Sequence, residues 1–316
     1  MKRLLMGLCL ISVSRGVAGQ QSPQTAGWHP TAGHDQIAIW PGVPPDAQPA
    51  RGPEVADWVK DHLVAGQRWT YVANVSRPTM TVYSPKGRNT GAAVVVFPGG
   101  GYRILAIDLE GTEVCDWITA KGITCVLLKY RVPGLPLTDR YRMSGPYPRS
   151  PVALEDAQRT LGLVRFNASK WNIDPHKIGV LGFSAGGHLS AAISVHYQKR
   201  LYAAVDAADR VSCRPDFAVA IYPGHLSMAE NSVALNPDIR PTAQTPPTFL
   251  LQNEDDNVDR VEDALSYYMG LKKAGASVEM HLYAEGGHAF GLRRTKFPAT
   301  AWPELVEKWL RALGMT

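Results

Sequence analysis

The chain has 316 residues, of which 45% are hydrophobic and 19% charged, a composition typical of one large α/β domain or two small ones. Its formal net charge is +5. The basic residues are scattered along the sequence rather than gathered in a stripe, which argues against a nucleic-acid-binding surface. No stretch approaches the roughly 20 apolar residues that a transmembrane helix needs.

The N-terminus has the pattern of a secretory signal peptide over residues 1–19. Lys2 and Arg3 precede an apolar run over 4–13, and small residues at 17–19 form a cleavage site. Arg15 is an imperfection in this pattern, and an amphipathic N-terminal helix is the alternative interpretation. We expect removal of this segment, with a loss of three positive charges, and a secreted or periplasmic protein without membrane attachment.

Residues 20–67 are rich in Pro, Gly and Ala, and we expect them to form an extended arm around the domain. Residues 68–316 show no internal repeat and no interdomain linker, so they are expected to form a single domain. The oligomeric state is left open by the sequence.

Strand and helix patterns alternate through this domain. Strands are expected at 68–75, 79–84, 92–97, 123–130, 177–181, 217–222, 248–252 and 278–283, and helices at 110–121, 151–171, 185–195, 258–274 and 302–313. The first two strands are expected at an edge, joined by a turn at Arg77 and Pro78. Connections of this length imply right-handed βαβ units, and therefore a doubly wound, mostly parallel sheet with helices on both faces.

Three cysteines remain once Cys9 has left with the signal peptide. The odd number argues against a disulfide framework, and Cys115 and Cys125 fall in an expected helix and core strand, so we expect buried thiols. A Cys115–Cys125 disulfide, or one that includes Cys213, is the alternative in an oxidising compartment. None of these cysteines has the CxxC or Cys/His spacing of a metal site, and no metal or organic cofactor is expected.

The most specific motif is Gly182-Phe183-Ser184-Ala185-Gly186-Gly187, which directly follows an apolar run and opens a helix rich in alanine. This arrangement resembles the tight strand-to-helix turn that presents a nucleophilic serine in α/β-hydrolases. Glycines at 182 and 186 are a steric requirement there, because side chains would collide with the neighbouring strand and helix. A chance G-x-S-x-G in a loop would lack these flanks.

A second glycine-rich segment, Phe97-Pro98-Gly99-Gly100-Gly101-Tyr102, follows the first buried strand. In this topology that loop supplies backbone N–H groups to the oxyanion, together with the N–H of the residue after the nucleophile, here Ala185. The alternative interpretation is a flexible turn.

His288, in Glu285-Gly286-Gly287-His288, is the leading candidate for the base because it follows the last expected strand, on the loop that faces the nucleophile. His188 lies four residues after Ser184, an offset that points its side chain along the helix and away from the hydroxyl. We therefore expect His188 to be packed or hydrogen-bonded rather than catalytic.

The third member of a triad should be a carboxylate after the strand at 248–252, where Glu254, Asp255 and Asp256 follow one another. Asp255 is preferred because it stands three residues before Val258, an arrangement usual at this loop. Asp256 is the second choice and Glu254 the third. A carboxylate that is not catalytic would cap the following helix.

Together with Ile37-Ala38-Ile39-Trp40-Pro41-Gly42, these motifs resemble the secreted bacterial acetylxylan-esterase-like branch of α/β-hydrolases, related to dienelactone hydrolases and feruloyl-esterase-like enzymes. The resemblance extends from about residue 37 to 313. It implies Ser184 as nucleophile, His288 as base and Asp255 as its orienting acid. It also implies an oxyanion hole made by the backbone N–H groups of Gly100, Gly101 and Ala185. One departure is Leu251-Gln252, where the family often has His-Gly.

The expected chemistry is ester hydrolysis through an acyl-enzyme intermediate. The expected substrate is a small-molecule or polysaccharide ester, with acetyl or another short acyl group favoured, and the segments 132–150 and 225–246 are expected to shape its pocket. Tyr102 is a candidate for stacking on sugar. Alternatives are a feruloyl or general short-chain carboxylesterase, a peptidase on the same fold, and a non-catalytic binding protein.

Overall fold

The computed structural model describes residues 27–316 except 48, 50–51, 60–61, 133–150 and 230. The expected signal peptide lies outside the described residues, as does nearly all of the expected pocket segment 132–150. In the part of the chain that is described, no helix combines the length and the apolar character needed to span a bilayer.

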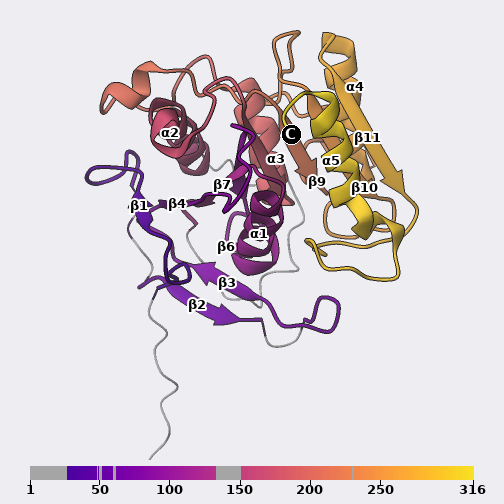
Figure 1. Cartoon of the computed structure of the whole chain (residues 1–316). Helices are drawn as coiled ribbons and strands as arrows, with labels where there is room; N and C mark the ends of the chain where they lie inside the picture. Colours follow the sequence, from indigo (N-terminus) through magenta and orange to yellow (C-terminus); the bar gives the residue numbers. More distant parts are fainter. Residues whose placement is uncertain (1–26, 48, 50–51, 60–61, 133–150, 230) are drawn as a thin grey trace, which may run out of the picture.

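The centre of the molecule is an eight-stranded sheet (Figure 1). Its strands, in spatial order, are β1 (Gln36–Ala38), β4 (Thr79–Tyr83), β7 (Thr124–Lys129), β5 (Ala93–Phe97), β8 (Ile178–Phe183), β9 (Ala218–Ile221), β10 (Thr248–Asn253) and β11 (Val278–Tyr283). The pairs β1–β4 and β4–β7 are antiparallel and all the others are parallel. The central strands are buried along their whole length, which explains their continuous apolar sequences. The predicted mostly parallel sheet is confirmed.

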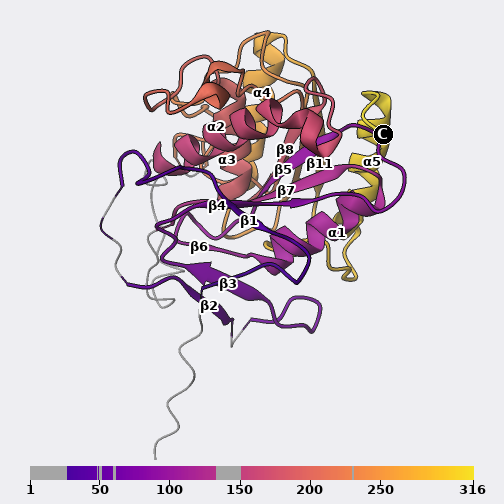
Figure 2. The ribbon, with the colours of Figure 1, turned by 60° about the vertical axis from the view of Figure 1, so that its left-hand side comes forward.

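Helices cover both faces of this sheet, as predicted. They are α1 (Glu113–Ala120), α2 (Pro151–Phe166), α3 (Ala185–Val195), α4 (Val261–Ala274) and α5 (Trp302–Ala312). Figure 2 shows α2, α3 and α4 on one side of the sheet and α1 on the other. Trp117 of α1 meets Trp302 of α5 edge to face, with ring centroids 5.3 Å apart, so these two helices share a side.

Short helical turns extend or flank several of these helices. A π-helical turn, Asp108–Thr112, leads directly into α1, and 3₁₀ turns lie at Ala168–Trp171, Ala207–Arg210 and Pro298–Ala301. The helix expected at 151–171 therefore ends at Phe166 and is followed by a separate 3₁₀ turn. The helix expected from residue 258 begins only at Val261, because the N–H groups of Val258 and Asp259 are bonded to the Asp256 side chain instead.

The N-terminal part of the chain contains more strand than predicted. The segment expected as an extended arm supplies β1, and also β2 (Val55–Trp58), which joins β3 (Thr70–Ala73) and β6 (Ile104–Leu105) in a second, three-stranded sheet. The expected pairing of 68–75 with 79–84 at one edge was wrong. After β3 the backbone enters the left-handed region at Asn74 (φ 56°), and β4 then joins the main sheet between β1 and β7.

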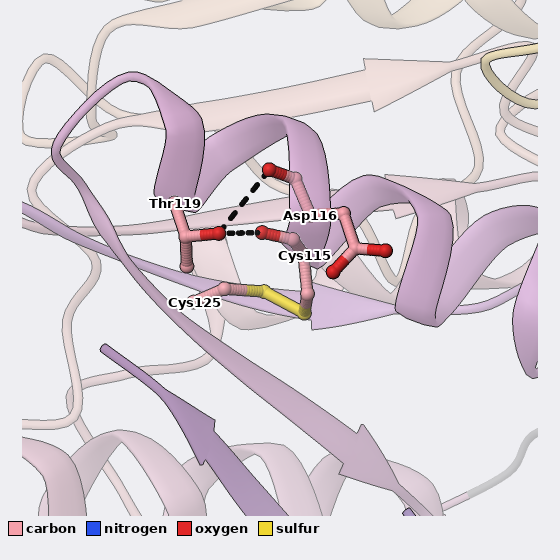
Figure 3. The surroundings of a disulfide bond; sticks show 4 residues. All are labelled: Cys115, Asp116, Thr119 and Cys125. Atoms are coloured by element: carbon pink, nitrogen blue, oxygen red, sulfur yellow. Dashed lines mark hydrogen bonds between the residues drawn. A yellow bond between two sulfur atoms is a disulfide. The ribbon is translucent and has the colours of Figure 1, made fainter. Parts of the chain in front are cut away.

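A disulfide between Cys115 and Cys125 joins α1 to β7 (Figure 3). The expectation of buried thiols was therefore wrong for this pair. The two residues are ten apart in sequence, yet their Cα atoms lie 5.2 Å apart, a separation that a disulfide requires. Cys213 is a buried free thiol, as expected.

We expect this disulfide to contribute roughly 2–3 kcal/mol to the free energy of unfolding, because it closes a short loop in the unfolded chain. The double variant Cys115→Ala, Cys125→Ala should therefore have a Tm lower by roughly 5 °C in thermal unfolding. Dithiothreitol should lower the Tm of the wild type and leave that of the double variant unchanged. Equal Tm values for the two proteins under oxidising conditions would contradict the expectation.

Candidate active site

Ser184 lies at the turn between β8 and α3, as predicted, with a backbone that few non-glycine residues adopt (φ 51°, ψ −118°). The turn is held from both sides, because the Ser184 N–H donates to Ile221 O and the Ser184 carbonyl accepts from the His188 N–H. The strained backbone therefore persists because neighbouring strand and helix fix it, and it points the serine side chain out of the sheet.

The two flanking glycines are required by close backbone contacts. A Cβ at Gly182 would lie 1.9 Å from the carbonyl oxygen of Gly186, and a Cβ at Gly186 would lie 2.0 Å from the carbonyl oxygen of Phe97. Backbone atoms cannot move aside as a flexible side chain can. The steric reason predicted for the G-x-S-x-G spacing is thus present in the structure.

The carboxylate bonded to His288 is Asp256, not Asp255. His288 Nδ1 and Asp256 Oδ2 are 2.6 Å apart, and the carboxylate is almost fully buried. The Asp256 Oδ1 atom accepts from the N–H groups of Val258 and Asp259, so both oxygens have partners. Such a carboxylate is fixed in orientation and holds its histidine in one tautomer, with the proton on Nδ1.

The expected placement of Asp255 was wrong because the strand before it runs one residue further than predicted. β10 ends at Asn253, which puts Glu254 and Asp255 on the exposed part of the turn. Asp255 Oδ1 accepts from the N–H of Gly287, so this residue supports the histidine loop without touching the imidazole. Gln252, at the departure from the family pattern, donates to Asp259 O and thereby holds the same turn.

The electrostatic surroundings of His288 favour its protonated form. Burial lowers the pKa of His288, but the charges of Asp256, Asp259 and Glu110, together with the hydrogen bond that Nδ1 donates to Asp256, outweigh this effect and raise the pKa to about 9. A protonated imidazole cannot take the serine proton, so the free enzyme becomes competent for general-base catalysis as pH rises through this range.

We therefore expect kcat/KM for p-nitrophenyl acetate, corrected for spontaneous hydrolysis, to rise with pH and to reach half of its limit near pH 9. Replacement of Asp256 by asparagine should move this midpoint to lower pH, because it removes the charge nearest to the imidazole. A midpoint below 6.5, the ordinary pKa of histidine, would contradict this assignment.

The glycine-rich loop lies against Ser184. A Cβ at Gly99 would lie 3.0 Å from Ser184 Cβ, and one at Gly100 would lie 2.2 Å from the carbonyl oxygen of Ile104. Gly100 and Gly101 have φ values of 130° and 63°, where glycine is favoured. The alternative of a merely flexible turn does not fit a loop packed this closely.

Of the three glycines in this loop, Gly99 has its N–H occupied, since it donates to Glu110 Oε2. Ala185 opens α3, so its N–H belongs to the first turn, where no helical acceptor exists. The N–H groups of Gly100, Gly101 and Ala185 thus remain the candidates for an oxyanion hole, as the family resemblance implies.

Glu110 is a buried carboxylate that no motif in the sequence singles out. Besides the Gly99 N–H, it accepts from the hydroxyl of Tyr222, which in turn accepts from the N–H of Gly291. The Tyr222 ring lies beside the His288 ring, with centroids 4.9 Å apart. One carboxylate therefore connects the loop beside Ser184 to the loop that carries His288, and burial raises its pKa.

Asp259 is a second carboxylate that sequence reasoning missed. Ser184 Oγ donates to Asp259 Oδ2 at 2.8 Å, and this oxygen also lies 3.7 Å from His288 Nε2. In this structure the serine hydroxyl is therefore bonded to Asp259 rather than to the imidazole. The position could have been suspected only from its place three residues after Asp256, on the same loop.

His188 and Tyr102, two further residues considered from the sequence, are hydrogen-bonded to each other. His188 Nδ1 is hydrogen-bonded to the Tyr102 hydroxyl at 2.7 Å, and burial lowers its pKa to about 3, so its predicted packed role is confirmed. Tyr102 is itself buried, which places it in the core rather than on a sugar platform. Within the described ranges, no three His, Cys, Asp or Glu side chains are grouped so as to hold a metal ion.

Two family models match the chain: BD-FAE over residues 80–222 and the prolyl oligopeptidase family over residues 156–313. Among curated proteins, it is 28% identical over 225 residues to an acetylxylan esterase of Xylanibacter ruminicola, an alignment covering 64% of this chain and 42% of that protein. It is also 28% identical over 221 residues to endo-1,4-beta-xylanase B of Butyrivibrio fibrisolvens, covering 65% of this chain and 33% of the xylanase. The chain thus spans less than half the length of these two relatives.

Among solved structures, an acetyl ester-xyloside bifunctional hydrolase from Caldicellulosiruptor lactoaceticus is 31% identical, with a TM-score of 0.68 and coverage of 89% of this chain and 97% of that one. An esterase of Thermogutta terrifontis shares the fold, with a TM-score of 0.60 at 23% identity, over 76% of this chain and 89% of that one. The chain is therefore an α/β-hydrolase that belongs to the prolyl oligopeptidase family and, within this fold, to the acetylxylan-esterase-like proteins.

Proposed function

We propose that the protein is a serine carboxylesterase that removes acetyl or other short acyl groups from a carbohydrate such as xylan. The observation that carries this proposal is the buried Asp256–His288 pair beside the strained Ser184 turn, with a glycine-rich loop packed on the same serine. These are the parts that acyl transfer requires: a nucleophile, an oriented base and backbone donors for an oxyanion.

In the proposed mechanism, Ser184 Oγ turns from Asp259 to His288 Nε2 and attacks the ester carbonyl while the imidazole takes its proton. The negative oxygen that develops is held by the N–H groups of Gly100, Gly101 and Ala185. His288 then returns the proton to the leaving alcohol. A water molecule repeats the sequence on the acyl-serine ester and releases the acid.

Carbohydrate ester substrates are favoured by the relatives, since the acetylxylan esterase and the acetyl ester-xyloside hydrolase carry this chemistry in their names. A feruloyl or general short-chain esterase remains an alternative within the same class. The match to the prolyl oligopeptidase family brings a peptidase into consideration. However, the curated relatives whose names state a reaction are ester and xylan hydrolases. A non-catalytic binding protein would not need an oriented Asp256–His288 pair.

Export from the cytoplasm forms part of the proposal. The N-terminal pattern of residues 1–19 favours it, and the Cys115–Cys125 disulfide supports it independently, because such bonds persist in oxidising compartments. We propose a secreted or periplasmic enzyme.

Release of acetate from acetylated xylan, measured against a Ser184→Ala control, tests the proposed function. In parallel, kcat/KM should fall from p-nitrophenyl acetate through butyrate to octanoate, because the glycine loop brings backbone close to the reacting carbonyl and leaves a shallow acyl pocket. A deep pocket would instead gain about 0.8 kcal/mol for each additional buried methylene. An optimum at octanoate, or xylan that keeps its acetyl groups, would contradict the proposal.

A further inference from the structure

Asp259 is unusual among the carboxylates of this site because its principal partner is the nucleophile itself. The residue is 1% exposed, and Gly224 packs so closely on it that a Cβ there would lie 2.1 Å from Asp259 Oδ1. His225 Nε2 lies 3.8 Å from the same oxygen, beyond hydrogen-bond distance. The other oxygen, Oδ2, accepts from Ser184 Oγ at 2.8 Å.

Catalysis must break that bond. The serine proton has to point at His288 Nε2 for general-base catalysis, so it cannot remain on Asp259 Oδ2 during attack. A buried carboxylate that loses its donor is destabilised strongly, and more so than a neutral acceptor. The free-energy cost of activating the serine therefore depends on whether something else donates to Asp259.

An ester of a polyol can supply this donor and a simple alkyl ester cannot. In a singly acetylated sugar, a free hydroxyl sits on the carbon next to the acetylated one, within a few ångströms of the reacting carbonyl. Because Asp259 Oδ2 lies within hydrogen-bond distance of Ser184 Oγ, which forms the new bond to that carbonyl, such a hydroxyl can reach it.

We propose that Asp259 is a specificity-determining residue that accepts a hydrogen bond from a substrate hydroxyl adjacent to the ester, once Ser184 has turned to His288. The inference rests on the proposed esterase function and names the substrate feature that the site selects: a free neighbouring hydroxyl on the alcohol. Burial raises the pKa of Asp259 to about 7, so the carboxylate is ionised at the alkaline pH where His288 loses its proton. An ionised acceptor then faces the substrate in the competent enzyme.

The test compares two acetates that differ by one hydroxyl, trans-2-hydroxycyclohexyl acetate and cyclohexyl acetate. For each enzyme the quantity of interest is the ratio of the two kcat/KM values. Since a hydrogen bond to a charged group corresponds to roughly a tenfold to hundredfold change, the wild type should prefer the hydroxylated ester by at least tenfold. Asp259→Ala should bring the ratio close to one, because it removes the acceptor and with it the cost of leaving a buried carboxylate unpaired, so hydrolysis of cyclohexyl acetate should rise toward that of the hydroxylated ester.

Asp259→Asn keeps the side-chain volume and a neutral acceptor, so it should retain an intermediate ratio, and it replaces the alanine variant if that does not fold. Glu254→Gln is the matched control, an exposed carboxylate on the same loop, and should keep the wild-type ratio. A wild-type ratio near one, or a ratio unchanged in both Asp259 variants, would overturn the inference. An equal loss of kcat/KM on both esters would also overturn it, because Asp259 would then only position Ser184 and would not bind the substrate hydroxyl.

A different experimental result would contradict the proposed function. In that case the wild type would leave acetylated xylan intact although it hydrolyses the two cyclohexyl esters, and the ratio measured on those esters would still decide the role of Asp259.

Discussion

Replacement of Ser184 by alanine is expected to reduce kcat for ester hydrolysis by about 10⁶-fold, the loss typical of removing a triad serine. Activity should be followed with p-nitrophenyl acetate at pH 9, where His288 is about half deprotonated. The fold should survive, because the substitution removes one hydroxyl and leaves the backbone contacts of the turn in place. Circular dichroism and a Tm within a few degrees of the wild type would show this.

A matched control is Ser194→Ala on the same helix. The Ser194 hydroxyl donates to the carbonyl oxygen of Ser190, one turn back along α3. This variant should keep near-wild-type activity. If Ser184→Ala retained more than about a hundredth of wild-type turnover, another group would have to be the nucleophile.

Asp256→Asn should reduce kcat by about 10⁴-fold, because the amide cannot hold His288 in the tautomer that presents Nε2 as a base and cannot stabilise the imidazolium. Asp255→Asn should cost less than tenfold, since its side chain reaches only the Gly287 N–H. Glu254→Gln should have no effect on kcat. All three variants are measured side by side, so that the comparison is between neighbours on one turn.

A larger loss in Asp255→Asn than in Asp256→Asn would return the role of the acid to Asp255. It would mean that the turn after β10 is one residue out of register in solution. The Asp256 variant should also retain the wild-type kcat/KM ratio for the two cyclohexyl acetates, because the neighbouring hydroxyl is expected to donate its hydrogen bond to Asp259 and not to Asp256.

The sequence predicted those parts of the fold that depend on local pattern. The run that became β5 is apolar along its whole length, that of β8 is apolar apart from its two glycines, and that of β11 alternates apolar and polar residues, while the helix at Ala185–Val195 was placed at its observed bounds. β1, β2 and β6 were missed because they have only two to four residues and are specified by partners distant in sequence.

The site was predictable where backbone geometry restricts the choice of residue. Gly182 and Gly186 indicate the tight turn, because a Cβ at either position would collide with backbone. Ser184 is then identified as the residue midway between them. The carboxylate that pairs with His288 could not be chosen from the sequence, because three carboxylates follow one another after the strand. Only the fold shows that one of them, Asp256, is buried. Glu110 and Asp259 carry no local signal, because each acts through a contact made when distant segments meet in the fold.

The shared anchor at Glu110 has a consequence for any attempt to rebuild this enzyme by exchanging loops with a relative. The glycine-rich loop and the histidine loop lie far apart in the sequence, yet the Gly99 N–H donates to Glu110 directly and the Gly291 N–H is connected to it through Tyr222. A grafted loop with a different backbone at Gly99 would remove a donor from the buried Glu110 carboxyl group, and one with a different backbone at Gly291 would remove the donor that holds the Tyr222 hydroxyl. Exchange therefore requires both loops, Glu110 and Tyr222 to be transferred as one module.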